Sequence, residues 1–251
     1  DAIPEDSPLK SNAEIQIAAN LDNLKRTDEA IARLESFIER SPDNYDAYVT
    51  LGNIQRVHEK WADAAVSYTK AIELANKQSD RYWTLLYFRG IAFERNKEWA
   101  KAEPDFLKAL ELQPDQPAVL NYLGYSWIEK GLNLSKAIGM VKKAVELRPN
   151  DGYIVDSLGW AHYQLNEFED AVKHLERAVE LRPEDPVIND HLGDAYWRVG
   201  RELEARFQWQ HAKDNKPEEK DLKTIEEKLL NGLPPLPEPQ PSADSTEPSK
   251  S

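Results

Sequence analysis

Small and bulky apolar residues recur along this chain at a nearly constant period. One set of equivalent positions holds glycines that lie 34 to 38 residues apart: Gly52, Gly90, Gly124, Gly159 and Gly193. In a second set, each alanine is followed four residues later by a large apolar residue: Leu34, Tyr68, Phe106, Val141, Leu175 and Trp209. A spacing of four places both members of a pair on one face of a helix. The pattern therefore predicts helices arranged as a repeat.

Each repeat is predicted to contain two helices. Another set of alanines lies within the second helix, and prolines follow it at Pro114, Pro149, Pro183 and Pro217. Glycine and alanine remove bulk where two helices cross, and proline prevents the second helix from continuing. We therefore expect an all-α fold without β-strands, built from six repeats: 11–44, 45–82, 83–116, 117–151, 152–185 and 186–219.

The two ends of the chain differ from the repeats. Apolar residues at helical spacing after Pro217 predict a polar capping helix at 220–232, which would cover the last repeat. Residues 1–10 and the proline-rich stretch 233–251 have few apolar side chains and are predicted to be disordered. Within repeat three, Pro104 is expected to kink its helix or delay the start of that helix.

Composition narrows the possible functions. Asp and Glu number 45 against 32 Lys and Arg, which gives a net charge of −13 and disfavours binding to nucleic acid. The chain has no cysteine, and its five histidines fall at different repeat positions, so no metal site recurs from repeat to repeat. Motifs of phosphate-binding loops, zinc proteases and serine hydrolases are also missing from the sequence. We therefore expect no catalytic residue, no cofactor and no enzymatic activity.

The order Gly, Ala, bulky residue, Ala and Pro within each period resembles the tetratricopeptide repeat. Membership of that family implies a right-handed solenoid whose first helices line a concave groove that binds proteins or peptides. The resemblance places the following residues in that groove: Tyr87, Asn121, Tyr125, Tyr153, Asp156, Trp160, Tyr163, Asp190, Asp194 and Trp197.

The predicted groove is rich in aromatic residues and acids in its later repeats. Exposed Tyr and Trp commonly anchor protein interfaces, and Asp156, Asp190 and Asp194 would select a basic and apolar partner segment. Two other interpretations stay open for these residues. The rings could pack against the neighbouring repeat while the acids only keep the surface soluble, or the three carboxylates could bind a cation.

Three segments, 121–127, 156–163 and 190–197, resemble the C-terminal repeats of proteobacterial tetratricopeptide lipoproteins. That group includes the outer-membrane adaptor that delivers substrates to a periplasmic carboxyl-terminal processing protease. The resemblance implies a periplasmic adaptor, anchored to the outer membrane through a lipid-bearing cysteine before Asp1. A cytoplasmic assembly scaffold and an accessory binding domain of a larger enzyme are the alternatives.

Overall fold

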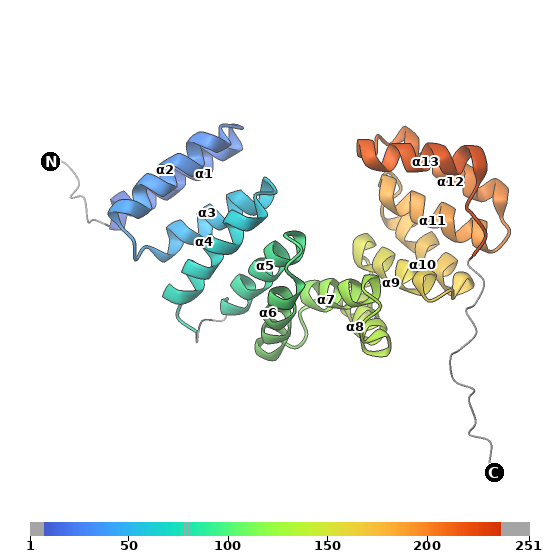
Figure 1. Ribbon diagram of the computed structural model, residues 1–251, viewed down its shortest axis with the longest axis horizontal. Helices are drawn as coiled ribbons and strands as arrows, with labels where there is room; N and C mark the ends of the chain where they lie inside the picture. The colour runs from blue at the N-terminus through green and yellow to red at the C-terminus, as the bar shows by residue number, and fades with distance from the viewer. Residues whose placement is uncertain (1–7, 78, 80, 237–251) are drawn as a thin grey trace, which may run out of the picture. The chain divides into compact units, whose positions relative to one another are not determined.

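The computed structural model describes residues 8–77, 79 and 81–236 (Figure 1), and within these ranges it contains thirteen α-helices and no β-strand. The first helices of the pairs are α1 (Pro8–Asn23), α3 (Tyr45–Val57), α5 (Tyr82–Arg95), α7 (Pro117–Glu129), α9 (Gly152–Gln164) and α11 (Pro186–Arg198). Their second helices are α2 (Thr27–Arg40), α4 (Trp61–Leu74), α6 (Trp99–Leu112), α8 (Leu134–Leu147), α10 (Phe168–Leu181) and α12 (Glu202–Asp214). The last helix is α13 (Glu219–Asn231). The predicted all-α repeat fold is confirmed.

The repeating glycines allow the two helices of a pair to approach closely. A Cβ atom on Gly193 would lie 2.4 Å from the ring of Trp209, and one on Gly90 would lie 2.7 Å from the ring of Phe106. Such distances are too short for real carbon atoms, so each ring fills the space that its glycine leaves. Trp209 and Phe106 are completely buried. The sequence pattern of small and bulky residues thus corresponds directly to the contact between paired helices.

Every first helix ends in the same kind of turn. The second residue after the helix has a positive φ in all six pairs, at Lys25, Glu59, Lys97, Gly131, Asn166 and Gly200. The amide of the next residue then donates to a carbonyl five residues earlier, as in the bond of 2.9 Å from Arg201 to Tyr196. This is the Schellman arrangement, which satisfies carbonyls that the helix end leaves without partners. It also reverses the chain so that the second helix can pack against the first.

The chain divides into two compact units, unit 1 (Asp1–Arg148) and unit 2 (Pro149–Ser251). Unit 1 contains α1–α8, and unit 2 contains α9–α13. In unit 2, the core joins buried residues of α10, α11 and α12 to Ile225 of α13, which is 1% exposed. Helix α13 therefore closes the end of that core.

Three predictions about individual segments need correction. Helix α1 begins at Pro8, so residues 8–10 are helical rather than disordered. Helix α6 begins at Trp99 and continues through Pro104, so a delayed start is wrong. The expected capping helix is present at Glu219–Asn231, but Leu233 beyond it packs against the core of unit 2 and is not a free tail. The predicted disorder of 1–7 and 237–251 lies outside the described residues.

Candidate protein-binding surface

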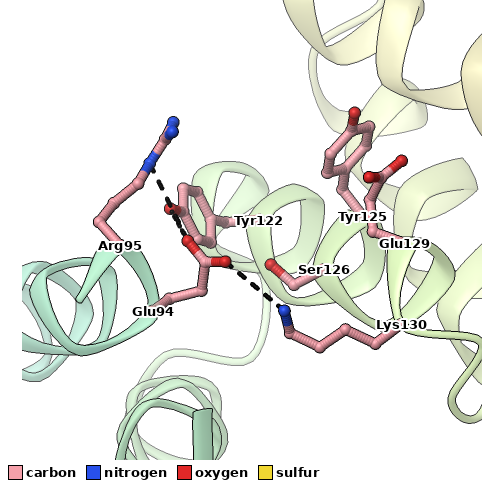
Figure 2. A pocket seen from close by; sticks show the side chains of 7 residues that line it. All are labelled: Glu94, Arg95, Tyr122, Tyr125, Ser126, Glu129 and Lys130. Atoms are coloured by element: carbon pink, nitrogen blue, oxygen red, sulfur yellow. Dashed lines mark hydrogen bonds and ion pairs between the residues drawn. The ribbon is translucent and has the colours of Figure 1, made fainter. Parts of the chain in front are cut away.

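The term first-helix face denotes the surface made by those side chains of the first helices that point away from the second helices of their pairs. It belongs to α1, α3, α5 and α7 in unit 1, and to α9 and α11 in unit 2. In unit 1 this face contains a pocket of about 370 Å³ between α5 and α7 (Figure 2). The pocket is lined by Glu94, Arg95, Tyr122, Tyr125, Ser126, Glu129 and Lys130.

Glu94 organises the polar groups of this pocket. The Tyr122 hydroxyl donates to its carboxylate at 3.1 Å, and the ammonium of Lys130 lies 3.6 Å from it. The Arg95 guanidinium is 3.9 Å away, and Figure 2 shows these groups around the carboxylate. Burial, followed by the charge of Glu94, raises the pKa of Tyr122, so its hydroxyl stays protonated at neutral pH. The pocket therefore presents fixed donors and acceptors next to an aromatic ring.

Tyr87 and Asn121 of the predicted groove also lie in unit 1. The ring of Tyr87 is half-buried and contacts Phe106 at 6.2 Å and Tyr122 at 6.1 Å between ring centroids. It therefore joins α5 to α6 and α7 at the floor of this face. Asn121 is partly buried on α7, directly before Tyr122. Neither residue lines the pocket.

In unit 2, three rings form a continuous stack on the first-helix face. The Trp160 ring lies parallel to the Tyr163 ring, with 4.5 Å between centroids and an angle of 6°. On its other side lies the His191 ring, at 4.0 Å and 15°. Because His191 belongs to α11, this stack ties α9 to α11. The interpretation that aromatic residues pack against the neighbouring repeat therefore holds for Trp160.

The three acids of unit 2 do not form an open acidic surface. Asp156 is 8% exposed and accepts a hydrogen bond of 2.9 Å from Nδ1 of His191 when that nitrogen is protonated. Burial opposes protonation of His191, but the charge of Asp156, followed by those of Asp190 and Asp194, raises the pKa of His191. Asp156 thus serves a contact within the unit.

Asp190 and Asp194 share one cation of the chain itself. The ammonium of Lys228, on α13, lies 2.8 Å from each carboxylate. Asp194 is 5% exposed and also accepts a hydrogen bond of 2.9 Å from Trp209. Its burial raises its pKa, an effect that Lys228 opposes and Asp190 reinforces. The prediction that Asp190 and Asp194 select a basic partner segment is wrong for these two residues, because both carboxylates are paired with Lys228. The same pairing opposes the alternative interpretation, in which the three carboxylates bind a cation.

Trp197 is also covered by the chain. Its ring contacts Trp209 at 5.4 Å between centroids, and the Arg206 guanidinium lies 5.3 Å from its centre. A Cβ atom on Gly232 would be 2.0 Å from the same ring, so the chain after α13 lies directly against it. Tyr153, in contrast, is 51% exposed with the Arg182 guanidinium 4.5 Å from its ring centre. It is the most accessible of the predicted groove aromatics in unit 2.

Several residues of the surface were not predicted from sequence. Tyr122, Ser126 and Lys130 line the pocket beside the predicted Tyr125, because the face is broader than one row of side chains. Including the helix positions on either side of the predicted row on α7 would have found these residues. Nothing in the sequence pattern indicated that Lys228 would lie at this face, since α13 does not follow the repeat pattern.

One group of side chains has a spacing that could hold a metal ion. Among the described residues, His162, Glu167 and Asp170 place ligand atoms within 4.8 Å of one another. His162 lies near the end of α9, whereas Glu167 and Asp170 lie at the start of α10, and the Glu167 carboxylate is 2.6 Å from Nδ1 of His162. This contact between α9 and the start of α10 accounts for the closeness of these side chains.

Family models describe most of the repeats. A tetratricopeptide repeat model matches residues 18–80 and 49–117, and a second model, described as a TPR repeat, matches residues 159–200. Together they cover more than half of the chain, and the solved structures that it resembles share the helix-pair fold. The chain is a tetratricopeptide repeat protein. Neither matching model describes an enzyme.

Proteins similar to this tetratricopeptide protein include a bacterial repeat protein and repeat proteins of known structure. The TPR repeat-containing protein PA4667 of Pseudomonas aeruginosa is 30% identical over 155 residues, which cover 60% of this chain but only 25% of that protein. The structure of the APC/C hetero-tetramer Cut9-Hcn1 matches 87% of the chain and 42% of its own, with a TM-score of 0.73 and 16% identity. That of YrrB, described as a TPR protein with an unusual peptide-binding site, matches 68% of the chain and 85% of its own, with a TM-score of 0.54 and 20% identity. At such identities the structures show the fold alone.

None of the described helices combines the length and the apolar character that crossing a bilayer requires.

Proposed function

We propose that this protein is a non-enzymatic adaptor or scaffold that binds a protein or peptide on its first-helix face. The observation that carries the proposal is the pocket in unit 1, where aromatic surface, hydroxyl groups and both signs of charge converge within about 370 Å³. Such a combination can hold a peptide by ring contacts and fix its register by hydrogen bonds. The exposed Tyr153 offers a second contact in unit 2.

The more specific proposal is an adaptor that delivers substrates to a periplasmic carboxyl-terminal processing protease. Its support is the resemblance of segments 121–127, 156–163 and 190–197 to proteobacterial tetratricopeptide lipoproteins. The similarity to a Pseudomonas aeruginosa repeat protein is compatible with it. In this proposal, a lipid anchor that precedes Asp1 holds the protein at the outer membrane. A cytoplasmic scaffold and a binding domain of a larger enzyme are the competing functions.

Site-specific crosslinking tests the binding surface. A photoreactive amino acid would replace Tyr125 or Tyr153 in turn, and a matched control would carry it at Lys173, an exposed position on the second helix α10. In cells of the source organism, both face positions should capture the same partner, while the control captures none. Equal capture at Lys173, or no capture at either tyrosine, would remove the first-helix face as the binding surface.

The protease proposal needs its own measurement. The purified chain should bind the processing protease of the same organism and accelerate cleavage of that enzyme's substrates. Tyr125→Ala and Tyr153→Ala should reduce the acceleration, and Lys173→Ala should not. Capture of a different partner with no effect on the protease would leave the adaptor role in place and reject this substrate-delivery role.

A further inference from the structure

The residues that follow α13 lie on the first-helix face of unit 2. We call Gly232–Leu236 the terminal segment. Gly232 is buried against Trp197, where any side chain would collide with the ring, and its φ of +70° favours glycine as well. The Pro234 carbonyl accepts a hydrogen bond of 2.7 Å from the guanidinium of Arg198. The terminal segment thus covers two neighbouring residues of α11, Trp197 and Arg198.

Arg198 connects the terminal segment to the aromatic stack. Its Nε donates to the Tyr163 hydroxyl at 3.2 Å, while Nη1 holds the Pro234 carbonyl. Tyr163 in turn stacks on Trp160. Arg198 therefore links the terminal segment to the rings of α9, and the segment's contacts combine an aromatic face, that of Trp197, with a donor to a backbone carbonyl. Aromatic grooves that bind proline-containing segments use this chemistry, because such segments lose little entropy on binding.

The terminal segment is held much less firmly than α13 itself. Helix α13 inserts Ile225 into the core and places Lys228 between two carboxylates. In the terminal segment, Leu233 is only partly buried, and Pro234, Pro235 and Leu236 are exposed. Removing this segment from α11 would break few contacts, whereas removing α13 would open the core. The two parts can therefore have separate roles.

We propose that the terminal segment is an internal ligand, and that the first-helix face of unit 2 binds an extended proline-containing segment of a partner protein in its place. The inference rests on the proposed protein-binding function and names the chemistry of the bound segment. A small residue would lie against Trp197, and a carbonyl two residues later would accept from Arg198. Because the internal ligand is tethered, its high effective concentration means that only a well-matched partner displaces it.

Binding of the isolated segment provides the direct test. The probe is a synthetic peptide with the sequence of residues 230–238 and blocked ends. By titration calorimetry, a chain that ends at Asn231 should bind it, and the full chain should bind it at least about tenfold more weakly. Arg198→Ala in the shortened chain should lower the affinity by about tenfold or more, and Lys173→Ala, at an exposed position on α10, should not. No binding to the shortened chain, equal binding to both chains, or equal losses in both variants would each overturn the proposal.

Thermal unfolding separates an internal ligand from a fixed part of the cap. The chain that ends at Asn231 should fold and melt about 3–8 °C below the full chain, as the loss of a bound internal ligand requires, and Ile225→Ala in the full chain should lower the midpoint much further. If the shortened chain melts as early as Ile225→Ala, or does not fold, the terminal segment is structural and the proposal is wrong.

The source of the displacing segment can also be tested. A full chain that dimerises in light scattering, and loses the dimer when it ends at Asn231, would show that the segment serves a second copy and would overturn an internal role. Crosslinking at Tyr125 lies in unit 1 and does not depend on the terminal segment. Failure of the peptide test therefore leaves the proposed function standing, and failure of the crosslinking test rejects the function itself.

Discussion

Replacing Lys228 by methionine tests the charge cluster that fastens α13 to α11. Lys228 has a side-chain exposure of 12%, and it faces Asp190 and Asp194, with exposures of 18% and 7%. Breaking a buried ion pair costs about 3–5 kcal/mol, because the remaining charge is left without compensation. The residual exposure of this cluster and proton uptake by a carboxylate both reduce the loss. We expect Lys228→Met to lower the free energy of unfolding of unit 2 by about 2–4 kcal/mol at pH 7.5.

The assay is urea unfolding at pH 7.5, with hydrogen exchange of α11–α13 peptides to assign the loss to unit 2. The matched control is Lys213→Met, which breaks a half-exposed ion pair of 2.9 Å with Glu226 between α12 and α13. An exposed pair contributes at most about 1 kcal/mol, so this control should change little. The cost of Lys228→Met should also be smaller at pH 5, since the already raised pKa of Asp194 lets that carboxyl take up a proton.

A triple variant separates the lost cation from lost packing. Adding Asp190→Asn and Asp194→Asn to Lys228→Met removes all three charges and leaves an amide oxygen for Trp209. It should recover most of the stability, since neutral groups of similar shape replace the uncompensated carboxylates. The reasoning fails if Lys228→Met costs less than the Lys213→Met control, or if the triple variant is no more stable than the single one.

Two further predictions concern unit 2 and the glycine contacts. Gly193→Ala should lower the free energy of unfolding by about 1–3 kcal/mol in urea unfolding, because its Cβ would lie 2.4 Å from Trp209. Gly139→Ala, in the interior of α8 with open space around it, should instead raise it by up to about 1 kcal/mol. Similar effects at both sites would contradict the packing argument. Because the pKa of His191 is raised in the folded state, its contribution to stability is complete below the unfolded pKa of about 6.5 and is lost as pH rises through the folded pKa. The free energy of unfolding of unit 2 should therefore increase from pH 8 down to about pH 6.5, and Asp156→Asn should flatten this dependence. An unchanged slope in that variant would exclude the His191–Asp156 pair as its origin.

The helix pairs could be predicted because each is specified by residues close together in the sequence. Gly90 and Phe106 contact each other across a single turn, and the same spacing returns in the neighbouring repeats. The pairing of the groove acids with residues of the chain itself could not be predicted in this way. Asp190 lies on a helix of the last repeat and Lys228 on the capping helix, and nothing in the repeat pattern assigns a partner to a capping helix. The burial of Trp197 likewise depends on Gly232, whose role is visible only once α13 is placed.

The recurrent turn after each first helix leaves room to adjust stability without changing the binding surface. Four of its six left-handed positions carry Lys25, Glu59, Lys97 and Asn166, and the other two carry glycine. A side chain in this conformation costs about 1 kcal/mol, and turns in separate repeats act almost independently. Single substitutions there could raise or lower the melting temperature in small steps while the partner meets the same side chains. Descendants of this protein could thus adapt to new growth temperatures through their turns and keep their ligands.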